Sequence, residues 1–391
     1  MFNNLQMARR RDRLLVGLAD LALRPLGWRR RRDGGRRPRR ILLLRLERIG
    51  DLLMVTDAIG LARDLAPEAE IDLAVGTWNA ELAALVRGID RIDIVDVPWL
   101  AREGRRSSWP ALVRHARGWR RRAYDLVVNF EPDIRSNFLA WLSGAPRRTG
   151  YWTGGGGAFL TDTAAYEPAV HVRSNAEGLV RRSLPEPAGR TVPMRTIRLE
   201  VPGAARARAD GLLAAASAPL LGVHASGGRP SKQWHPGRFA DAARELAQRH
   251  AATIVLTGSP PDRPLVDAVS ARLHGLPVID LCGRLDLATL AAVLGRLDLF
   301  VTGDTGPMHL AAAVGTPLVA LFGPSDPRRY GPVGSPHEVL RIDLPCSPCG
   351  MVRLPPVRCR NRVPECLDGI GVDEVVAAGD RLLAARRTVH T

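Results

Sequence analysis

Lys232 is the residue whose type most clearly suggests chemistry. Of the 56 lysine and arginine residues in the 391-residue chain, it is the one lysine. An ammonium is a compact point charge on a flexible stem, whereas a guanidinium is a rigid fork of donors. Lys232 follows a strand-like apolar run, 220–224, in a loop rich in Ser and Gly, where a lysine is well placed to bind phosphate. We therefore predict a phosphate clamp; the alternative is a chance survivor of an arginine-biased composition.

A turn near residue 304 is a second candidate for phosphate binding. A strand-like run ends at Thr302 and is followed by Gly-Asp-Thr-Gly at 303–306 and by Pro307, which is favoured in the first turn of a helix. Free N–H groups and the dipole at a helix start attract phosphate, and the glycines allow a ligand to approach closely. The Thr305 hydroxyl can also donate. His309 is expected on the first helical turn, facing the same pocket, although a lone histidine is usually structural.

Two carboxylates fall at similar turns between a strand and a helix. Asp51 ends the segment Arg-Leu-Glu-Arg-Ile-Gly-Asp at 45–51, after the apolar run 41–44. An aspartate at a helix start commonly caps free N–H groups, but from the end of a strand Asp51 could also accept a proton from a substrate hydroxyl. Asp262 ends the turn 257–262, where an acid could hold ribose hydroxyls or cap the next helix.

From residue 41 onward, strand-like and helix-like segments alternate, which predicts parallel sheets covered by helices. The first series has strands at 41–44, 71–75, 92–97 and 125–130 and helices at 51–65, 109–122 and 134–142. The second has strands at 220–224, 253–257, 278–281, 299–302 and 318–322 and helices at 236–249, 262–273, 286–294 and 307–314. We predict an α/β protein of two doubly wound, Rossmann-like domains, 41–200 and 201–391, linked within 183–218. Ligands should bind in a cleft at the carboxyl ends of the strands.

The positive charge is concentrated in an arm, residues 1–40. The chain carries a net charge of +16, and the arm alone holds 13 arginines and three aspartates, or +10. The remaining +6 is too evenly spread for us to expect specific nucleic-acid binding by the body of the protein. The arm contains no cleavable signal sequence, and no run approaches the ~18 apolar residues that cross a bilayer. These observations predict a cytoplasmic protein.

The arm also carries a short leucine stripe. Leu14, Leu18 and Leu21 fall at helical spacing between clusters of arginine. This pattern suits the surface of an anionic membrane. The alternative is a solvated tail.

Three of these segments resemble glycosyltransferase family 9, the bacterial heptosyltransferases of lipopolysaccharide synthesis. RLERIGD at 45–51 is similar to the family's N-terminal signature, and HASGGRPSKQWHPGRFADAARELAQRH at 224–250 to its donor-phosphate segment. GDTGPMHLAAAVGTPLVALFGPSDPRRYGP at 303–332 is similar to the C-terminal signature and is the most specific of the three. The resemblance extends from about residue 41 to the C-terminus and leaves out the arm.

The resemblance implies a GT-B fold with an N-terminal acceptor-binding domain and a C-terminal domain that binds the nucleotide-sugar donor. It implies inverting transfer from ADP-heptose, without a metal or other cofactor, to a sugar hydroxyl of a lipopolysaccharide core acceptor, which is a lipid-linked oligosaccharide. Asp51 matches the general base, and Lys232 matches the lysine that neutralises the leaving diphosphate. The positions that match donor-binding residues are Ser226, Asp262, Asp304, Thr305, Gly306 and His309. The loop at Ser226 has one residue more than the family pattern, and Asp262 stands where Glu is commoner.

Five cysteines have no role in this chemistry. Cys282 lies in an apolar segment and is expected in the core. The other four, Cys346, Cys349, Cys359 and Cys366, precede the final helix in a Pro-rich loop. They could bind a structural zinc or iron ion, form a redox pair, or remain free thiols.

Other functions remain open from the sequence. Within the same class, the enzyme could use another nucleotide sugar or a protein or polysaccharide acceptor, selected by loops at 151–157 and 171–175. From a different class, the chain could be a non-catalytic nucleotide or nucleic-acid binder. The combination of Asp51, Lys232 and the 303–309 turn favours the enzyme.

Overall fold

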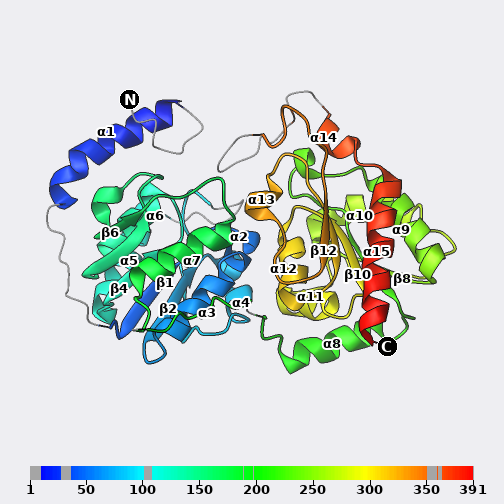
Figure 1. The fold of residues 1–391 in the computed structure, drawn as a ribbon, viewed down its shortest axis with the longest axis horizontal. Coiled ribbons are helices and arrows are strands. Elements are labelled where there is room, and N and C mark those ends of the chain that lie inside the picture. Colours follow the sequence, from blue (N-terminus) through cyan, green and yellow to red (C-terminus); the bar gives the residue numbers. More distant parts are fainter. Residues whose placement is uncertain are drawn as a thin grey trace. The chain divides into compact units, whose positions relative to one another are not determined.

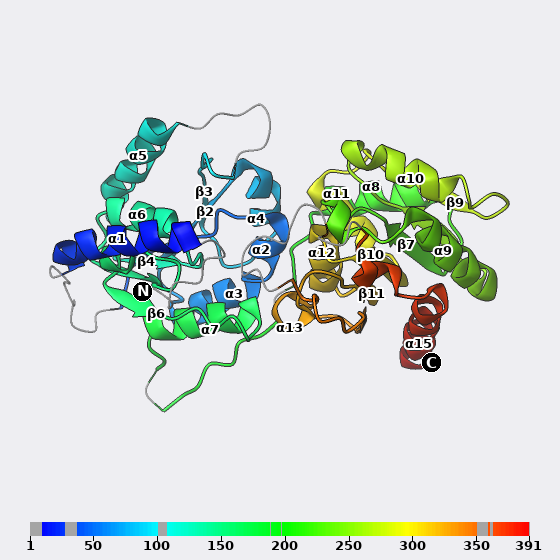
Figure 2. The same cartoon turned by 90° about the horizontal axis from the view of Figure 1, so that it is seen from above.

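The structure, a computed structural model, describes residues 10–27, 37–100, 108–187, 189–196, 198–349, 359 and 363–390. The chain divides into two compact units, unit 1 (Met1–Ile197) and unit 2 (Arg198–Thr391). Each unit is built around a parallel six-stranded sheet with helices packed against it, as Figures 1 and 2 show.

The sheet of unit 1 has the strand order β3-β2-β1-β4-β5-β6. Its strands are β1 (Arg40–Leu44), β2 (Glu70–Val75), β3 (Arg91–Ile94), β4 (Leu126–Asn129), β5 (Arg147–Tyr151) and β6 (Asp162–Ala164). Its α-helices are α1 (Arg10–Gly27), α2 (Ile49–Leu53), α3 (Thr56–Leu65), α4 (Ala80–Ala83), α5 (Trp109–Gly118), α6 (Ile134–Leu142) and α7 (Val172–Ser183), and its 3₁₀ helices are η1 (Thr77–Asn79), η2 (Trp119–Arg122) and η3 (Gly157–Phe159). The central strand β1 is fully buried from Ile41 to Leu44, which explains why its sequence is a continuous apolar run.

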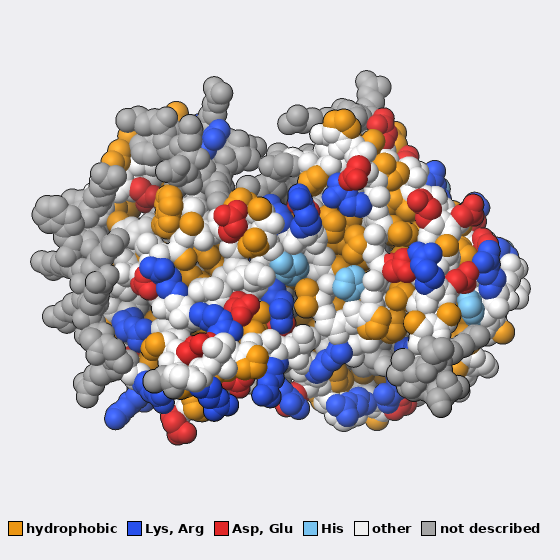
Figure 3. All heavy atoms as spheres, viewed as in Figure 1, with side chains coloured by type: hydrophobic (Ala, Val, Ile, Leu, Met, Phe, Trp, Pro, Cys, Tyr) orange, Lys and Arg blue, Asp and Glu red, His pale blue; other side chains and the backbone are white. Residues whose placement is uncertain are grey.

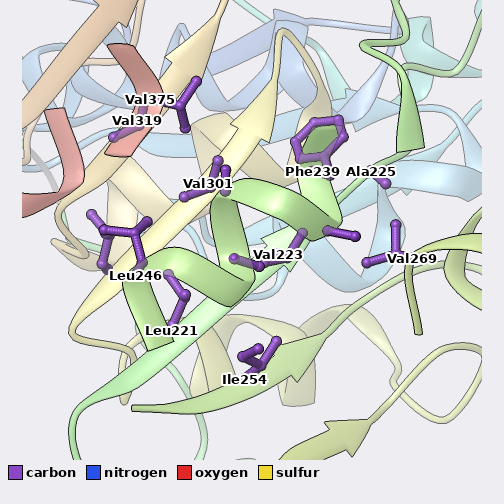
Figure 4. Close-up of a cluster of buried hydrophobic side chains, with 14 of the residues drawn as sticks. Leu221, Val223, Ala225, Phe239, Leu246, Ile254, Val269, Val301, Val319 and Val375 are labelled. Atoms are coloured by element: carbon purple, nitrogen blue, oxygen red, sulfur yellow. The ribbon is translucent and has the colours of Figure 1, made fainter. Parts of the chain in front are cut away.

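Unit 2 repeats this topology with the order β12-β11-β10-β7-β8-β9. Its strands are β7 (Leu220–His224), β8 (Thr253–Leu256), β9 (Val278–Asp280), β10 (Leu299–Gly303), β11 (Leu318–Leu321) and β12 (His337–Leu340). Its α-helices are α8 (Gly203–Leu213), α9 (Pro236–His250), α10 (Arg263–Ser270), α11 (Leu287–Leu294), α12 (Gly306–Val314), α13 (Pro327–Tyr330), α14 (Glu365–Asp368) and α15 (Val372–His390), with 3₁₀ helices η4 (Pro230–Lys232) and η5 (Pro260–Asp262). Figure 4 shows the core on one face of this sheet, where Val223 and Val301 pack beneath Phe239 and Leu246 of α9.

Several predicted elements differ from those observed. The helix expected at 51–65 is divided into α2 and α3. The segment 171–175, predicted as a loop, instead begins α7, where His171 Nδ1 accepts a hydrogen bond from Arg173 N at 3.0 Å. Helix α8 lies within the segment 183–218 that was expected to be a linker, and Arg208 of this helix forms a 2.8 Å ion pair with Asp286 in unit 2.

Residues 10–27 of the arm form a helix, α1, and not a solvated tail. Helix α1 packs against η3, and Asp20 Oδ1 accepts a hydrogen bond from Gly156 N at 2.6 Å. Gly155, with φ of +87°, has no room for a β-carbon because Val16 approaches it closely. Residues 1–9 and 28–36 of the arm lie outside the described residues.

The described helices are too short or too polar to cross a bilayer, and charges of both signs are present on the surface seen in Figure 3. Within the described ranges, no helix combines the length and the apolar character that crossing a membrane requires. On the face drawn in Figure 3, basic side chains are interspersed with acidic ones.

Candidate active site

The candidate residues other than Asp262 lie where the strand order of each sheet reverses. In each unit the first strand is flanked by the second and the fourth: β1 by β2 and β4, and β7 by β8 and β10. Ligands bind in such sheets outside the carboxyl ends of the strands at this point of reversal. In unit 1 it is formed by residues 45–51 after β1 and 130–133 after β4. In unit 2 it is formed by residues 225–232 after β7 and 304–309 after β10.

In unit 2, Lys232 meets the turn that precedes α12. Its Nζ donates to Asp304 Oδ2 at 2.5 Å, and the two side chains are only 19% and 10% exposed. Burial alone would raise the pKa of Asp304, but the charge of Lys232 and hydrogen bonds from Lys232 and Ser325 lower it below its usual value. The Asp304 carboxylate is therefore charged at neutral pH. Gly227 makes this geometry possible, because a β-carbon there would collide with the carbonyl group of Lys232.

The start of α12 has the features of an anion-binding helix terminus. Thr305 is the N-cap residue, but its side chain does not cap the helix. Its hydroxyl lies instead 3.3 Å from the carbonyl oxygen of Gly303, which leaves the N–H groups of the first turn of α12 uncapped by that side chain. His309 is buried in the first turn, near enough to Asp304 for its charge to lower the pKa of that carboxyl. The start of α12 and the Lys232 ammonium are thus brought to one place.

Ser226, which follows β7, interacts with Asp262, which follows β8, the neighbour of β7 on the side away from β10. Burial would raise the pKa of Asp262, but hydrogen bonds from Ser226 and Ser259 lower it. Asp262 Oδ2 accepts from Ser259 N at 2.8 Å, so the capping role that the sequence left open is present. His224, which ends β7, is buried, and burial lowers its pKa. It is therefore neutral at physiological pH.

In unit 1, Asp51 lies at the start of α2 with its carboxylate 28% exposed. Its Oδ2 accepts from Arg48 N at 3.0 Å, which is the capping contact expected of an aspartate in this position. Its Oδ1 lies 3.4 Å from Nη2 of Arg45. Arg45 is nearly buried and also donates to the carbonyl oxygen of Phe130 at 2.9 Å, which joins the ends of β1 and β4. Asp51 is therefore held in place but remains accessible.

Glu131 is a residue at this edge that the sequence reasoning missed. Its side chain is buried, and its Oε1 accepts a hydrogen bond from Leu46 N at 2.5 Å. Burial, followed by repulsion from Glu47, raises the pKa of Glu131 to about 8, and Arg45 offsets this only in part. Glu131 therefore keeps its proton at neutral pH. The sequence feature that could have identified Glu131 is its position directly after the predicted strand 125–130.

The predicted core position of Cys282 is confirmed, because its side chain is buried. Burial raises the pKa of Cys366 to about 11, with further contributions from Cys349, Cys359 and Cys346. These four thiols therefore lie near one another. In the part of the chain that the structure describes, no three side chains of His, Cys, Asp or Glu are arranged to hold a metal ion.

Comparison with protein families identifies the chain. A family model described as glycosyltransferase family 9 (heptosyltransferase) matches residues 112–353, well over half of the sequence. The chain belongs to glycosyltransferase family 9. It is therefore an enzyme that transfers a glycosyl group, as the three sequence segments predicted. The matched region includes Lys232 and the 303–309 turn, whereas Asp51 lies before it.

Individual relatives extend the similarity to most of the chain. Lipopolysaccharide heptosyltransferase 1 of Pseudomonas aeruginosa is 29% identical over 328 residues, which cover 79% of this chain and 86% of the relative. The structure of a family 9 glycosyltransferase from Veillonella parvula is 25% identical with a TM-score of 0.76, covering 89% of this chain and 98% of that one. Escherichia coli ADP-heptose lipopolysaccharide heptosyltransferase II, at 20% identity, has the same fold, with a TM-score of 0.72 and coverage of 89% and 99%. The predicted fold class, GT-B with two Rossmann-like domains, is confirmed.

Proposed function

We propose that this enzyme transfers a heptose from ADP-heptose to a sugar hydroxyl of a lipopolysaccharide core acceptor, with inversion at the anomeric carbon and without a metal ion. The observation that carries the proposal is the Lys232–Asp304 pair at the start of α12, in a chain of family 9. The similarity to a lipopolysaccharide heptosyltransferase of P. aeruginosa supports the acceptor class. The E. coli neighbour, an ADP-heptose enzyme, supports the donor.

In this proposal unit 2 binds the donor through its diphosphate. An ammonium has three N–H donors, and Asp304 accepts one of them, so two are available for phosphate oxygens. The Gly306 N–H at the start of α12 and the side chains of Thr305 and His309 add further donors on the same side. Together they stabilise the charge that develops on the departing diphosphate.

Ser226 and Asp262 are proposed to contact the ribose side of the nucleotide. Asp262 uses Oδ2 to cap the turn, which leaves its other oxygen to accept from a ribose hydroxyl. A hydroxyl at Ser226 and a carboxylate at Asp262 that hydrogen-bond each other would hold this part of the ligand in one orientation.

In unit 1, Asp51 is proposed to be the general base. The pKa of Glu131 near 8 leaves that carboxyl protonated and unable to accept a proton at neutral pH. Asp51 is ionisable, partly exposed and oriented by Arg45. Of the two carboxyl groups, Asp51 is therefore the one suited to deprotonate an acceptor hydroxyl.

The proposed reaction is a single displacement. The acceptor oxygen attacks the anomeric carbon as its proton passes to Asp51, and a new carbon–oxygen bond forms. The bond between the anomeric carbon and the diphosphate oxygen breaks on the opposite face, and ADP leaves with the bonding electrons. Attack from the opposite face inverts the configuration. Because such an acceptor is lipid-linked, contact of residues 1–40 with the cytoplasmic face of the inner membrane belongs to this proposal.

The test is a donor screen on the purified protein. Thermal shifts are measured with ADP, UDP, GDP and CDP, and transfer is then assayed with the corresponding sugar donors and a heptose-free core acceptor. We expect the largest shift with ADP, its loss in Lys232→Met, and transfer from ADP-heptose. A larger shift with another nucleotide, or transfer from its sugar alone, would assign the enzyme a different donor.

A further inference from the structure

The outward face of α1 is the most concentrated apolar surface among the described residues. The described residues include eight exposed large hydrophobic side chains, and four of these eight belong to α1. Leu14, Leu15, Leu18 and Leu21 are 48%, 56%, 58% and 38% exposed. Leu14, Leu18 and Leu21 recur at i, i+4 and i+7, so they form one side of the helix. We refer to these four residues as the leucine face.

The opposite side of α1 is attached to unit 1. Val16 packs against Gly155, and Asp20 accepts the hydrogen bond from Gly156. These two residues are also four positions apart, so they share a side of the helix that points away from the leucine face. Asn137 fixes the loop beneath them by donating to the carbonyl oxygens of Tyr151 and Gly155 at 3.0 and 2.8 Å. The helix is thereby held with its leucines outward.

The charge of the sequence before and after the leucines indicates what covers the leucine face. In the sequence, Arg9, Arg10, Arg11 and Arg13 precede the leucines and Arg29–Arg32 follow them. A partner protein with an apolar groove would not require this excess of positive charge at both ends of the helix, but an anionic lipid surface attracts it. Lasting attachment to a bilayer generally needs two signals, such as an apolar insertion and a polybasic cluster. Helix α1 and its flanking sequence supply both.

We propose that α1 is an interfacial helix that inserts its leucine face among the headgroups of an anionic membrane while Val16 and Asp20 hold it to unit 1. The helix does not cross the bilayer; it lies along the surface and fixes the side of unit 1 that faces the lipid. This inference rests on the membrane contact included in the proposed function and specifies the surface that makes it. Because its test uses neither donor nor acceptor, its failure and the failure of the proposed function are distinguishable.

The experiment is co-sedimentation of the full-length protein with vesicles of phosphatidylglycerol and phosphatidylcholine, and with vesicles of phosphatidylcholine alone. The test variant changes Leu14, Leu15, Leu18 and Leu21 together to Gln, which keeps a good helix former at each position. A half-exposed leucine gains about half of its full burial energy on insertion, roughly a factor of 3 to 10 in affinity each. Because the four factors multiply, we expect the variant to bind anionic vesicles at least about a hundredfold more weakly.

A matched control changes three equally exposed hydrophobic residues elsewhere, Ile94→Gln, Val170→Gln and Val363→Gln. The control should bind vesicles as the unmodified protein does, and circular dichroism should show that both variants are folded. Equal binding by the leucine variant would overturn the proposal and leave the arginines as the sole attachment. A dimer in the absence of lipid that becomes monomeric in the leucine variant would assign the face to a second copy of the chain. Failure of the unmodified protein to bind anionic vesicles would refute membrane insertion outright.

Discussion

Removing the charge of Lys232 should affect stability and transfer through different contacts. Lys232→Met keeps most of the side-chain length but leaves Asp304, 10% exposed, without its cationic partner. Breaking a buried ion pair from one side costs about 3–5 kcal/mol, because the remaining charge is desolvated and uncompensated. Since Lys232 retains some exposure, at 19%, we expect a value near the lower limit, about 3 kcal/mol.

A double-mutant cycle separates the pair from the individual residues. Urea unfolding is measured for the unmodified protein, Lys232→Met, Asp304→Asn and the double variant, and hydrogen exchange of β10 and α12 peptides reports unit 2 specifically. The double variant removes both charges, so it should recover most of the loss, with an interaction energy of about 2–3 kcal/mol. An interaction below about 0.5 kcal/mol, the value for a solvent-exposed pair, would refute the reasoning that burial makes this pair strong.

Transfer activity should not vary in parallel with the free energy of unfolding across these variants of Lys232 and Asp304. If Lys232 binds the leaving diphosphate, both Lys232→Met and the double variant should lose activity by about two to three orders of magnitude. Lys232→Arg keeps the charge and should remain badly impaired, because a planar fork cannot occupy the position of a compact ammonium. If activity were restored in the double variant, Lys232 would act only through its ion pair with Asp304. If Lys232→Arg were close to the unmodified enzyme in activity, Lys232 would act only as a positive charge.

Three further predictions concern the remaining candidate groups. Asp51→Asn should abolish turnover while ADP-heptose binding by calorimetry is unchanged; measurable turnover would exclude Asp51 as the base. The folded pKa of Glu131, about 8, lies above its ordinary value of 4.5, so its contribution to stability is present below the ordinary value and is lost as pH rises through 8. Unfolding free energy should therefore fall by about 2 kcal/mol between about pH 6 and about pH 8 in the unmodified protein and not in Glu131→Gln; equal pH dependence of both proteins in urea titrations would contradict this. In a time course with a thiol reagent, the exposed Cys346 should react first. Cys282 and Cys366 should react last, because both are buried and their pKa values are raised. Protection of Cys346 together with Cys366 would instead indicate a bound metal or a disulfide.

Local sequence patterns were sufficient where a segment's environment matches its composition. Helix α6 has the bounds predicted, Ile134–Leu142, and it begins after Asp133, which caps it by accepting from Arg135 N at 2.8 Å. Strands β1 and β7 were predicted because strands buried on both faces are continuous apolar runs. In such segments the residue pattern and the tertiary environment carry the same information.

Strand β5 shows why other elements were missed. It begins with Arg147 and Arg148, which do not resemble a central strand of a sheet. Arg148 Nε reaches the carbonyl oxygen of Phe159 at 2.7 Å, and Arg147 donates to the carbonyl oxygen of Ser183. The strand therefore depends on partners that are distant in sequence. Helix α8 was missed for a related reason: its Ala- and Arg-rich composition has little amphipathic pattern, and packing against α11 in unit 2 stabilises it.

The candidate site was predicted in outline because strand ends could be placed, but its electrostatics could not. Lys232 and Asp304 are 72 positions apart, and their contact depends on β7 and β10 being neighbours, which no local pattern specifies. The pKa of Glu131 depends on burial and on Glu47, more than 80 residues earlier in the sequence. Properties that arise from strand order are visible only in the folded chain.

The two points of strand reversal have the same topology but opposite chemistry. The one in unit 1 gathers the carboxyl groups of Glu47, Asp51 and Glu131 around a single buried cation, Arg45. The one in unit 2 combines an ammonium with the start of a helix, both of which attract negative charge. An inverting glycosyl transfer requires a group that accepts a proton from the acceptor and, separately, a field that stabilises an anionic leaving group. One duplicated fold can therefore meet both requirements without a change in topology, since only the residues after the first and fourth strands of each sheet need to differ.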